Sequence, residues 1–256
     1  MFSKLLKNDL SQMGSRIYPL YLIILGLAFF AKAMNILSTH IGAFQMIYGF
    51  TVMAWVCSII ICLVYTFFVS IQIFYRKNLR DEGYLTHTLP VTKTSIVSSM
   101  FITAIIYTII TVLIIILSVM ITFYTPGIFH DFYNAIQTTW NSLNILTVII
   151  MVLSYMQLLS SIYCALSIGH SFSSNKLAYS VVFWVVIYVI SQILNVIGIL
   201  ILASIQPEIF YETYNEQIGM NFAYGTFITS IITNSIMLTG TYITTIMMLK
   251  HRLNLE

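Results

Sequence analysis

Residues 76–93 read RKNLRDEGYLTHTLPVTK and form the longest strongly polar stretch between two very hydrophobic blocks. The stretch contains four of the eleven Lys and Arg residues and two of the eight acidic residues. The blocks on either side have the composition of lipid-facing helices, so this stretch is the part of the chain best suited to meet a partner outside the membrane. The rest of the chain consists of apolar blocks separated by short polar connections.

The overall composition is that of a membrane protein. Hydrophobic residues make up 59% of the 256 residues and charged residues only 7%, and the mean hydropathy is +0.93. Soluble domains carry about a quarter charged residues, so this chain has too few charges to cover a surface that faces water. The sequence therefore predicts an all-α polytopic membrane protein with a single transmembrane domain, 1–256, and argues against nucleic-acid binding.

Six apolar runs are long enough to cross a bilayer as helices, for which about 20 residues are needed. They cover 17–37, 46–75, 96–124, 143–168, 177–205 and 223–249. The predicted organisation is an N-terminal segment (1–16), two spans (17–75), a polar loop (76–95), three spans (96–205), a second polar loop (206–222), a last span (223–249) and a tail (250–256).

The N-terminal segment has the pattern of an amphipathic helix in the membrane interface. Phe2, Leu6 and Met13 share one helical face, and Lys4 and Lys7 lie on the opposite face. Such a helix buries its apolar side in the lipid boundary and turns its basic side towards anionic headgroups. We therefore expect 1–16 to form a separate interfacial helix.

The Lys and Arg residues predict the orientation. The basic side of the predicted topology comprises 1–16, 76–95, Lys176 and 250–256. The loops expected on the other side, 125–142 and 206–221, contain acidic residues but no Lys or Arg. Because basic loops stay in the cytoplasm, both termini are predicted to be cytoplasmic in a multi-pass protein of the plasma membrane.

A few strongly polar residues interrupt the apolar runs. Lys32 lies near the outer end of the first run, where its amine can reach the membrane surface or line a pore. The others are amides: Gln72, Gln157, Gln192, Asn195 and Asn234. Amides in lipid bond to neighbouring helices or contact a substrate, so these six residues are the candidate polar lining of a substrate path.

Glu208, Glu212 and Glu216 follow one another at intervals of four residues in the second polar loop. This spacing places them on one face of a short outer helix. The face is either the solvated rim of an interfacial helix or a vestibule that attracts cationic cargo. In the second case, replacing the three glutamates by glutamine should impair the handling of a cationic substrate.

The sequence lacks the motifs of several enzyme classes. None of its glycines is followed by lysine, so the chain has no phosphate-binding loop for ATP. Its histidines are scattered, and Cys57, Cys62 and Cys164 lie in apolar runs without ligand spacing. We predict no enzyme active site, no metal site and no cofactor in this chain.

The centre of the first polar loop has the pattern of a short helix lying across the membrane surface. Its residues are Asp81, Glu82, Gly83, Tyr84, Leu85, Thr86, His87, Thr88, Leu89 and Pro90. The amphipathic N-terminal segment, the six spans and this sequence between the second and third spans together resemble the permease subunits of ATP-binding-cassette transporters of the type-2 exporter family. The resemblance covers the whole chain in architecture, and its specific sequence content lies in 81–90.

This resemblance implies that 81–90 is a coupling helix, which docks into a groove on a separate nucleotide-binding subunit. ATP and Mg²⁺ would then bind to that subunit. A second copy of the chain, or a related permease, would complete the transporter in a bacterial plasma membrane. An amphipathic cargo is expected, such as an antimicrobial or other peptide, or a role in immunity to such peptides. The alternatives from the residues alone are a non-transporting membrane scaffold or sensor and an ATP-independent channel.

Overall fold

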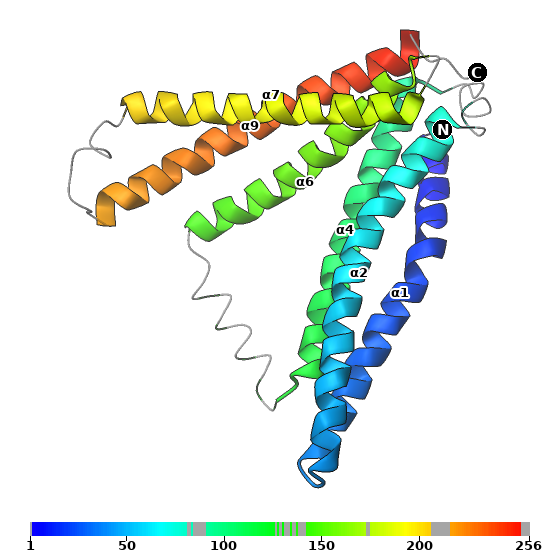
Figure 1. The fold of residues 1–256 in the computed structure, drawn as a ribbon, viewed down its shortest axis with the longest axis vertical. Coiled ribbons are helices and arrows are strands. Elements are labelled where there is room, and N and C mark those ends of the chain that lie inside the picture. The colour runs from blue at the N-terminus through cyan, green and yellow to red at the C-terminus, as the bar shows by residue number, and fades with distance from the viewer. Residues whose placement is uncertain are drawn as a thin grey trace. The chain divides into compact units, whose positions relative to one another are not determined.

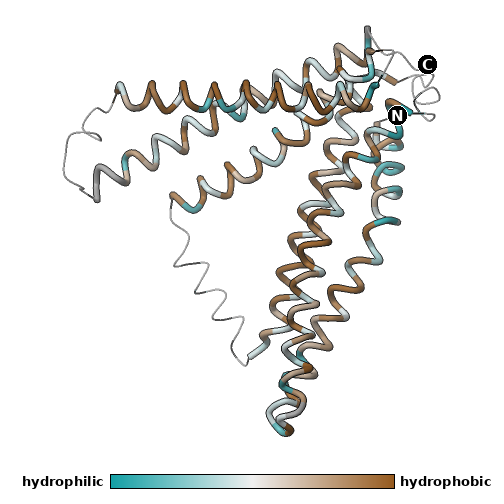
Figure 2. Tube along the Cα trace, viewed as in Figure 1, coloured by the Kyte–Doolittle hydropathy of each residue, from teal (hydrophilic) through white to brown (hydrophobic). Residues whose placement is uncertain are grey.

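The described part of the structure, a computed structural model, contains six long helices (Figure 1). They are α1 (Phe2–Ser38), α2 (Ala43–Leu79), α4 (Lys93–Thr122), α6 (Ser142–Gly169), α7 (Lys176–Ile205) and α9 (Glu216–His251). The residues described are 2–80, 83, 91–125, 127, 130, 134, 137, 142–172, 175–205 and 216–251, without the side chains of 43, 142, 216–219 and 251. Each of the six helices contains a stretch long and apolar enough to cross a membrane, and Figure 2 shows how apolar residues dominate them. The structure thus confirms a multi-pass α-helical membrane protein.

The helix boundaries differ from the sequence prediction at the polar segments. The helix α2 continues to Leu79, four residues past the predicted end at 75, and Arg76 and Lys77 lie in its last turn. Basic residues suit this position because the carbonyl end of a helix carries partial negative charge. The helix α4 begins at Lys93, after Thr92, whose side chain accepts a hydrogen bond from the Ser95 N–H. The polar loop between these helices is therefore shorter than predicted.

The N-terminal segment is not a separate helix. A single helix α1 runs from Phe2 to Ser38 through the predicted boundary at residue 16. The Asp9 carboxylate is fully buried, and the Ser99 hydroxyl of α4 donates to its Oδ2 at 2.6 Å. The expected separate interfacial helix over 1–16 is therefore not observed, because this segment packs against α4. The hydrogen bond from Ser99 compensates the burial of the Asp9 carboxylate.

Most of the predicted coupling helix lies outside the described residues: Asp81, Glu82 and 84–90. Gly83 is helical, and its N–H donates to the Arg80 carbonyl at 2.6 Å. The predicted outer helix also lies mostly outside the described part, including Glu208 and Glu212. Glu216 is the first residue of α9, which thus begins before the predicted start at 223.

The chain divides into two compact units. The N-terminal unit comprises Met1–Phe74 and Pro90–Ala135, and the C-terminal unit comprises Tyr75–Leu89 and Ile136–Glu256. The N-terminal unit thus contains α1, α4 and most of α2, and the C-terminal unit contains α6, α7 and α9.

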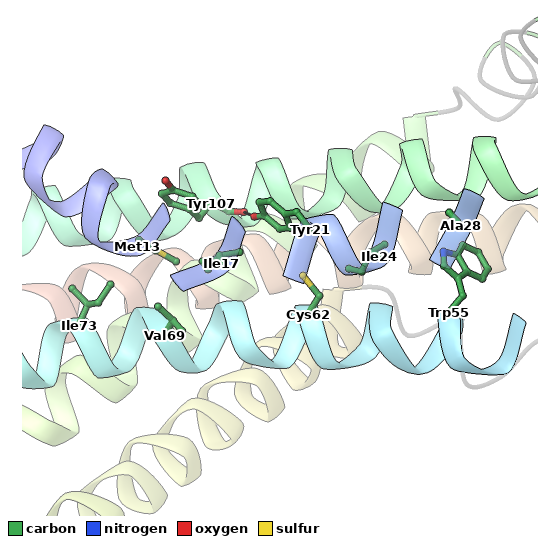
Figure 3. Close-up of a cluster of buried hydrophobic side chains, with 10 residues drawn as sticks. All are labelled: Met13, Ile17, Tyr21, Ile24, Ala28, Trp55, Cys62, Val69, Ile73 and Tyr107. Carbon is green, nitrogen blue, oxygen red and sulfur yellow. Dashed lines mark hydrogen bonds between the residues drawn. The ribbon is translucent and has the colours of Figure 1, made fainter. Parts of the chain in front are cut away.

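The core of the N-terminal unit is a stripe along α1 packed against α2 and α4 (Figure 3). The buried residues of the cluster are Met13, Ile17, Tyr21, Ile24 and Ala28 from α1, Trp55, Cys62, Val69 and Ile73 from α2, and Tyr107 from α4. The α1 residues are three or four positions apart, which places them on one face of the helix. Apolar packing therefore holds this unit together along the length of its helices.

Hydroxyl groups link the three helices at the centre of this core. The Tyr21 and Thr111 hydroxyls are 2.7 Å apart, and the Thr111 and Thr66 hydroxyls are 3.2 Å apart. The Tyr107 hydroxyl donates to the Leu10 carbonyl at 2.9 Å. It lies where a side chain on Gly14 would be, so α4 approaches α1 closely because this position lacks a Cβ.

In the C-terminal unit, α6 and α9 run parallel and α7 runs antiparallel to both. Residue numbers rise together in the pairs Ser160–Thr241, with hydroxyls 2.8 Å apart, and Cys164–Thr244, with Sγ and Oγ1 2.9 Å apart. On α7 the order is reversed: Asn195 bonds to Thr233 of α9, whereas the later residue Leu202 lies against the earlier residue Gly225. Polar groups thus fix the register of α6 against α9.

The turn between α6 and α7 is tightly packed. Asn175 has a positive φ of 50°, a conformation that asparagine tolerates better than most residues. The buried His170 donates through Nδ1 to the Leu166 carbonyl at 2.9 Å, and its ring lies edge-on to Tyr75 with centroids 5.3 Å apart. Burial lowers the pKa of His170; the Leu166 carbonyl opposes this shift, and the charge of Lys176 adds to it. The imidazole is therefore held in its neutral form.

Candidate functional site

A polar cavity of about 520 Å³ lies between α6, α7 and α9 of the C-terminal unit. It is lined by Ile150, Ser154, Gln157, Leu158 and Ser161 of α6, by Trp184, Tyr188, Ser191, Gln192, Asn195 and Ile199 of α7, and by Thr226, Thr229, Ser230 and Asn234 of α9. Figure 1 shows α6 diverging from α7 towards the N-terminal end of α6. The volume falls within the range of roughly 300–1,000 Å³ that is typical of small-molecule sites.

The cavity forms because polar residues recur at helical spacing in otherwise apolar helices. On α6, Ser154, Gln157 and Ser161 follow at intervals of three and four residues, and Ser191 and Asn195 do so on α7. Such intervals place side chains on one face of a helix. Each of the three helices thus contributes one polar stripe, and the packing of the unit brings the stripes together.

Four of the six residues predicted for a substrate path line this cavity: Gln157, Gln192, Asn195 and Asn234. The other two belong to the N-terminal unit. Gln72 accepts a hydrogen bond from Arg16 at 2.8 Å. Lys32 donates to the Tyr124 carbonyl and lies 5.8 Å from the centroid of the Tyr124 ring. These contacts give Gln72 and Lys32 partners within their own unit.

Two of the four cavity amides bond to a neighbouring helix. Thr233 of α9 donates to Asn195 Oδ1 at 2.7 Å. Asn234 Nδ2 of α9 donates to the Ser154 hydroxyl of α6 at 3.2 Å. Both pairs link α9 to another wall of the cavity, so these asparagines support helix packing.

The two glutamines differ from the asparagines. Gln157 is half-buried and Gln192 is exposed, and neither side-chain amide has a hydrogen-bond partner among the residues that the structure describes. Partnered asparagines and unpartnered glutamines therefore occupy the same cavity. The former hold its walls, and the latter are available to a bound molecule.

The cavity has neutral polar walls with an aromatic side. Its described lining contains no Asp, Glu, Lys, Arg or His. Trp184 and Tyr188 lie one turn apart on α7, with ring centroids 6.3 Å apart and planes inclined by 30°. They are 37% and 54% exposed, so the cavity has an aromatic edge on the outside of the helix. Such a surface accommodates apolar or ring-bearing groups beside hydrogen-bonding groups.

Sequence reasoning missed the hydroxyl residues of the cavity. Ser154, Ser161, Ser191, Thr226, Thr229 and Ser230 were not predicted as site residues, although they line it. Ser154, Ser161, Ser191 and Ser230 each lie three or four residues from a predicted amide on the same helix, and this spacing was the available signal. Within the described residues, no group of three His, Cys, Asp or Glu side chains is placed to hold a metal ion.

No protein-family model, curated protein or solved structure matches this chain.

Proposed function

We propose that this chain is the membrane-spanning permease subunit of an ATP-driven exporter that moves an amphipathic cargo. The observation that carries the proposal is the polar, uncharged cavity between three helices that expose many large apolar side chains. Polar groups within membrane-spanning helices are costly unless they serve packing or a solute path. The unpartnered Gln157 and Gln192 favour a solute path, and the aromatic edge suits a cargo that is partly apolar.

The energy source in this proposal is a separate nucleotide-binding subunit that binds ATP and Mg²⁺. The sequence has no phosphate-binding loop of its own, and the segment 81–90 has the pattern that resembles a coupling helix. This segment connects α2 to α4, two long helices that run antiparallel, as the contacts Thr66–Thr111 and Trp55–Phe123 indicate. A subunit docked on the segment would therefore act directly on the ends of two helices.

The complete transporter in this proposal contains two permeases and two nucleotide-binding subunits. The second permease is another copy of this chain or a related one. The segment 76–95 and both termini lie in the cytoplasm in this proposal, as the distribution of Lys and Arg suggests, and so do the nucleotide-binding subunits. The chain itself performs no catalysis, and the cargo class includes antimicrobial and other peptides.

The test is a double substitution in the proposed coupling helix, Glu82→Ala with Tyr84→Ala. The permease is purified together with its nucleotide-binding subunit, reconstituted in liposomes, and assayed for ATP hydrolysis and for peptide flux. We expect the variant to insert and fold normally but to lose the dependence of flux on ATP hydrolysis. Normal ATP-driven flux in the variant would contradict the assignment of the coupling helix.

A matched control is available in the second polar loop. Glu212 and Tyr214 have the same residue types at the same spacing as Glu82 and Tyr84, on the side of the membrane that has no basic loop. Glu212→Ala with Tyr214→Ala should leave coupling intact. If no nucleotide-binding protein associates with the chain, or if flux proceeds without nucleotide, the exporter proposal fails and a scaffold or a channel is favoured.

A further inference from the structure

Two glutamine amides in the polar cavity are not satisfied by the chain itself. Gln157 of α6 and Gln192 of α7 have no side-chain hydrogen bond in the described part of the structure. An amide without a partner is unfavourable in apolar surroundings, because it loses its bonds to water and gains none. The two side chains are therefore positioned to bind a molecule that enters the cavity.

The hydroxyl groups of the cavity offer mainly acceptors. Ser161 and Ser191 donate to backbone carbonyls of their own helices, each at 2.7 Å. Thr226 and Thr229 do the same on α9, each at 2.9 Å. Because these hydroxyl protons are already used, the oxygen lone pairs remain for a ligand. The cavity therefore favours a ligand that carries N–H donors.

The cavity also favours a neutral ligand. Its described lining carries no ionisable acid or base of the Asp, Glu, Lys, Arg or His type. An ammonium or carboxylate group would lose its hydration without gaining a counter-charge, and this loss is large in a low-dielectric site. A neutral N–H group loses much less. Trp184 and Tyr188 on the aromatic edge, together with Ile150 and Ile199, provide surfaces for apolar groups.

We infer that the cavity binds an uncharged stretch of peptide backbone, with backbone N–H groups on the glutamine and hydroxyl oxygens. Each glutamine amide has an acceptor and two donors in one plane, which can pair with both the N–H and the C=O of a peptide group. Apolar side chains of the peptide lie against Trp184 and Tyr188. The inference rests on the proposed function in treating this ligand as cargo, but the binding step itself requires neither ATP nor a partner subunit.

The first part of the test measures binding to the complete chain in lipid nanodiscs. The probe is an acetylated, amidated tetrapeptide of leucine and alanine. Its binding is followed as the change in tryptophan fluorescence that the wild-type chain shows and the Trp184→Phe variant lacks. Two analogues have the same length: one has N-methylated peptide groups, and the other has one lysine. We expect each analogue to bind about tenfold or more weakly than the parent. No binding of the parent, equal binding of the N-methylated analogue, or equal or tighter binding of the lysine analogue would overturn the inference.

The second part of the test changes the glutamines. Gln157→Leu and Gln192→Leu should each weaken binding of the parent peptide by about tenfold. The control is Gln45→Leu, which changes an exposed glutamine of α2 in the N-terminal unit and should leave binding unchanged. Without peptide, the cavity variants should melt at or above the wild-type temperature, because an unsatisfied amide has been removed.

Three outcomes of this second part overturn the inference. They are an unchanged affinity for the peptide in both cavity variants, a lower melting temperature in both, or a number of chains per nanodisc in the cavity variants that differs from that of the wild type. The second would show that the glutamines serve packing, and the third that a second copy of the chain fills the cavity. Binding of the peptide without ATP-driven flux in the full complex would overturn the exporter function alone. ATP-driven peptide flux at the wild-type rate in both variants would overturn this inference alone.

Discussion

The contact between α6 and α7 at Gly169 predicts a loss of stability on a minimal substitution. A Cβ at Gly169, the buried last residue of α6, would lie 2.6 Å from the backbone nitrogen of Ser180 and 2.7 Å from its Cα. Both neighbours are backbone atoms, so no change of rotamer relieves the overlap. The two helices would have to move apart in Gly169→Ala. Overpacking of this kind costs about 1–3 kcal/mol, and the better helix propensity of alanine returns at most about 1 kcal/mol.

A control for this prediction lies in the same unit. Gly240 of α9 has no atom within 4 Å of the position that a Cβ would occupy. Gly240→Ala should therefore gain about 0.5–1 kcal/mol, because alanine loses less backbone entropy in a helix than glycine does. The two variants add the same methyl group and should change stability in opposite directions.

The assay is unfolding of the purified chain in mixed micelles, in which SDS is titrated and helix content is followed by circular dichroism. We expect the free energy of unfolding to fall by about 1–2 kcal/mol in Gly169→Ala and to rise in Gly240→Ala. Peptide binding should weaken in the first variant only, because α6 and α7 form two walls of the cavity. A Gly169→Ala chain as stable as wild type would refute the close approach of the two helices.

Three further predictions use the same unfolding assay. Gly14→Ala brings a methyl group against the Tyr107 hydroxyl, so we expect a loss of about 1–2 kcal/mol; no loss would contradict the contact between α1 and α4. A double-mutant cycle with Ser160→Ala and Thr241→Val should give a coupling energy of about 0.6 kcal/mol, and a value of zero would argue against their hydrogen bond. Burial lowers the pKa of His170 below 6.5, so the unfolded chain takes up a proton more readily than the folded one. The free energy of unfolding should thus fall as the pH drops below about 6.5, and His170→Gln should lack this part of the pH dependence.

Hydropathy was sufficient to find the helices but not to place their ends. A helix that faces lipid must be apolar over about 20 residues, and the described helices contain the six predicted runs almost entirely. The polar residues at the ends of the helices are under no such requirement, so hydropathy does not locate the first and last residue of each helix. Residues 2–16 are helical whether they lie on a membrane or pack against α4, and only contacts with α4, such as Asp9 with Ser99 and Leu10 with Tyr107, distinguish the two cases. These contacts join residues 90 and 97 positions apart, so no local pattern predicts them.

The candidate site was predictable in its residue types and unpredictable in its assembly. Gln72 and Gln157 each lie within an apolar run in the sequence, yet Gln72 pairs with Arg16 and Gln157 lines the cavity. Which amides meet depends on the register of α6, α7 and α9, and contacts distant in sequence set that register, such as Ser160 with Thr241. Serine and threonine carry even less local information, because their hydroxyls bond to their own helix whether or not a cavity lies beside them.

From the sequence alone, all the amides within the helices have the same two possible roles, helix packing or contact with a ligand. The contacts in the structure distinguish these roles residue by residue. Asn195 and Asn234 each hold a partner on a neighbouring helix, so replacing either should lower stability whatever the cargo is. Gln157 and Gln192 contribute no such bond in the described residues, and replacing them by leucine should not lower the stability of the empty chain. A polar residue that packing does not require is retained at a cost in lipid. That cost is the physical reason to look for the ligand at the two glutamines rather than at the two asparagines.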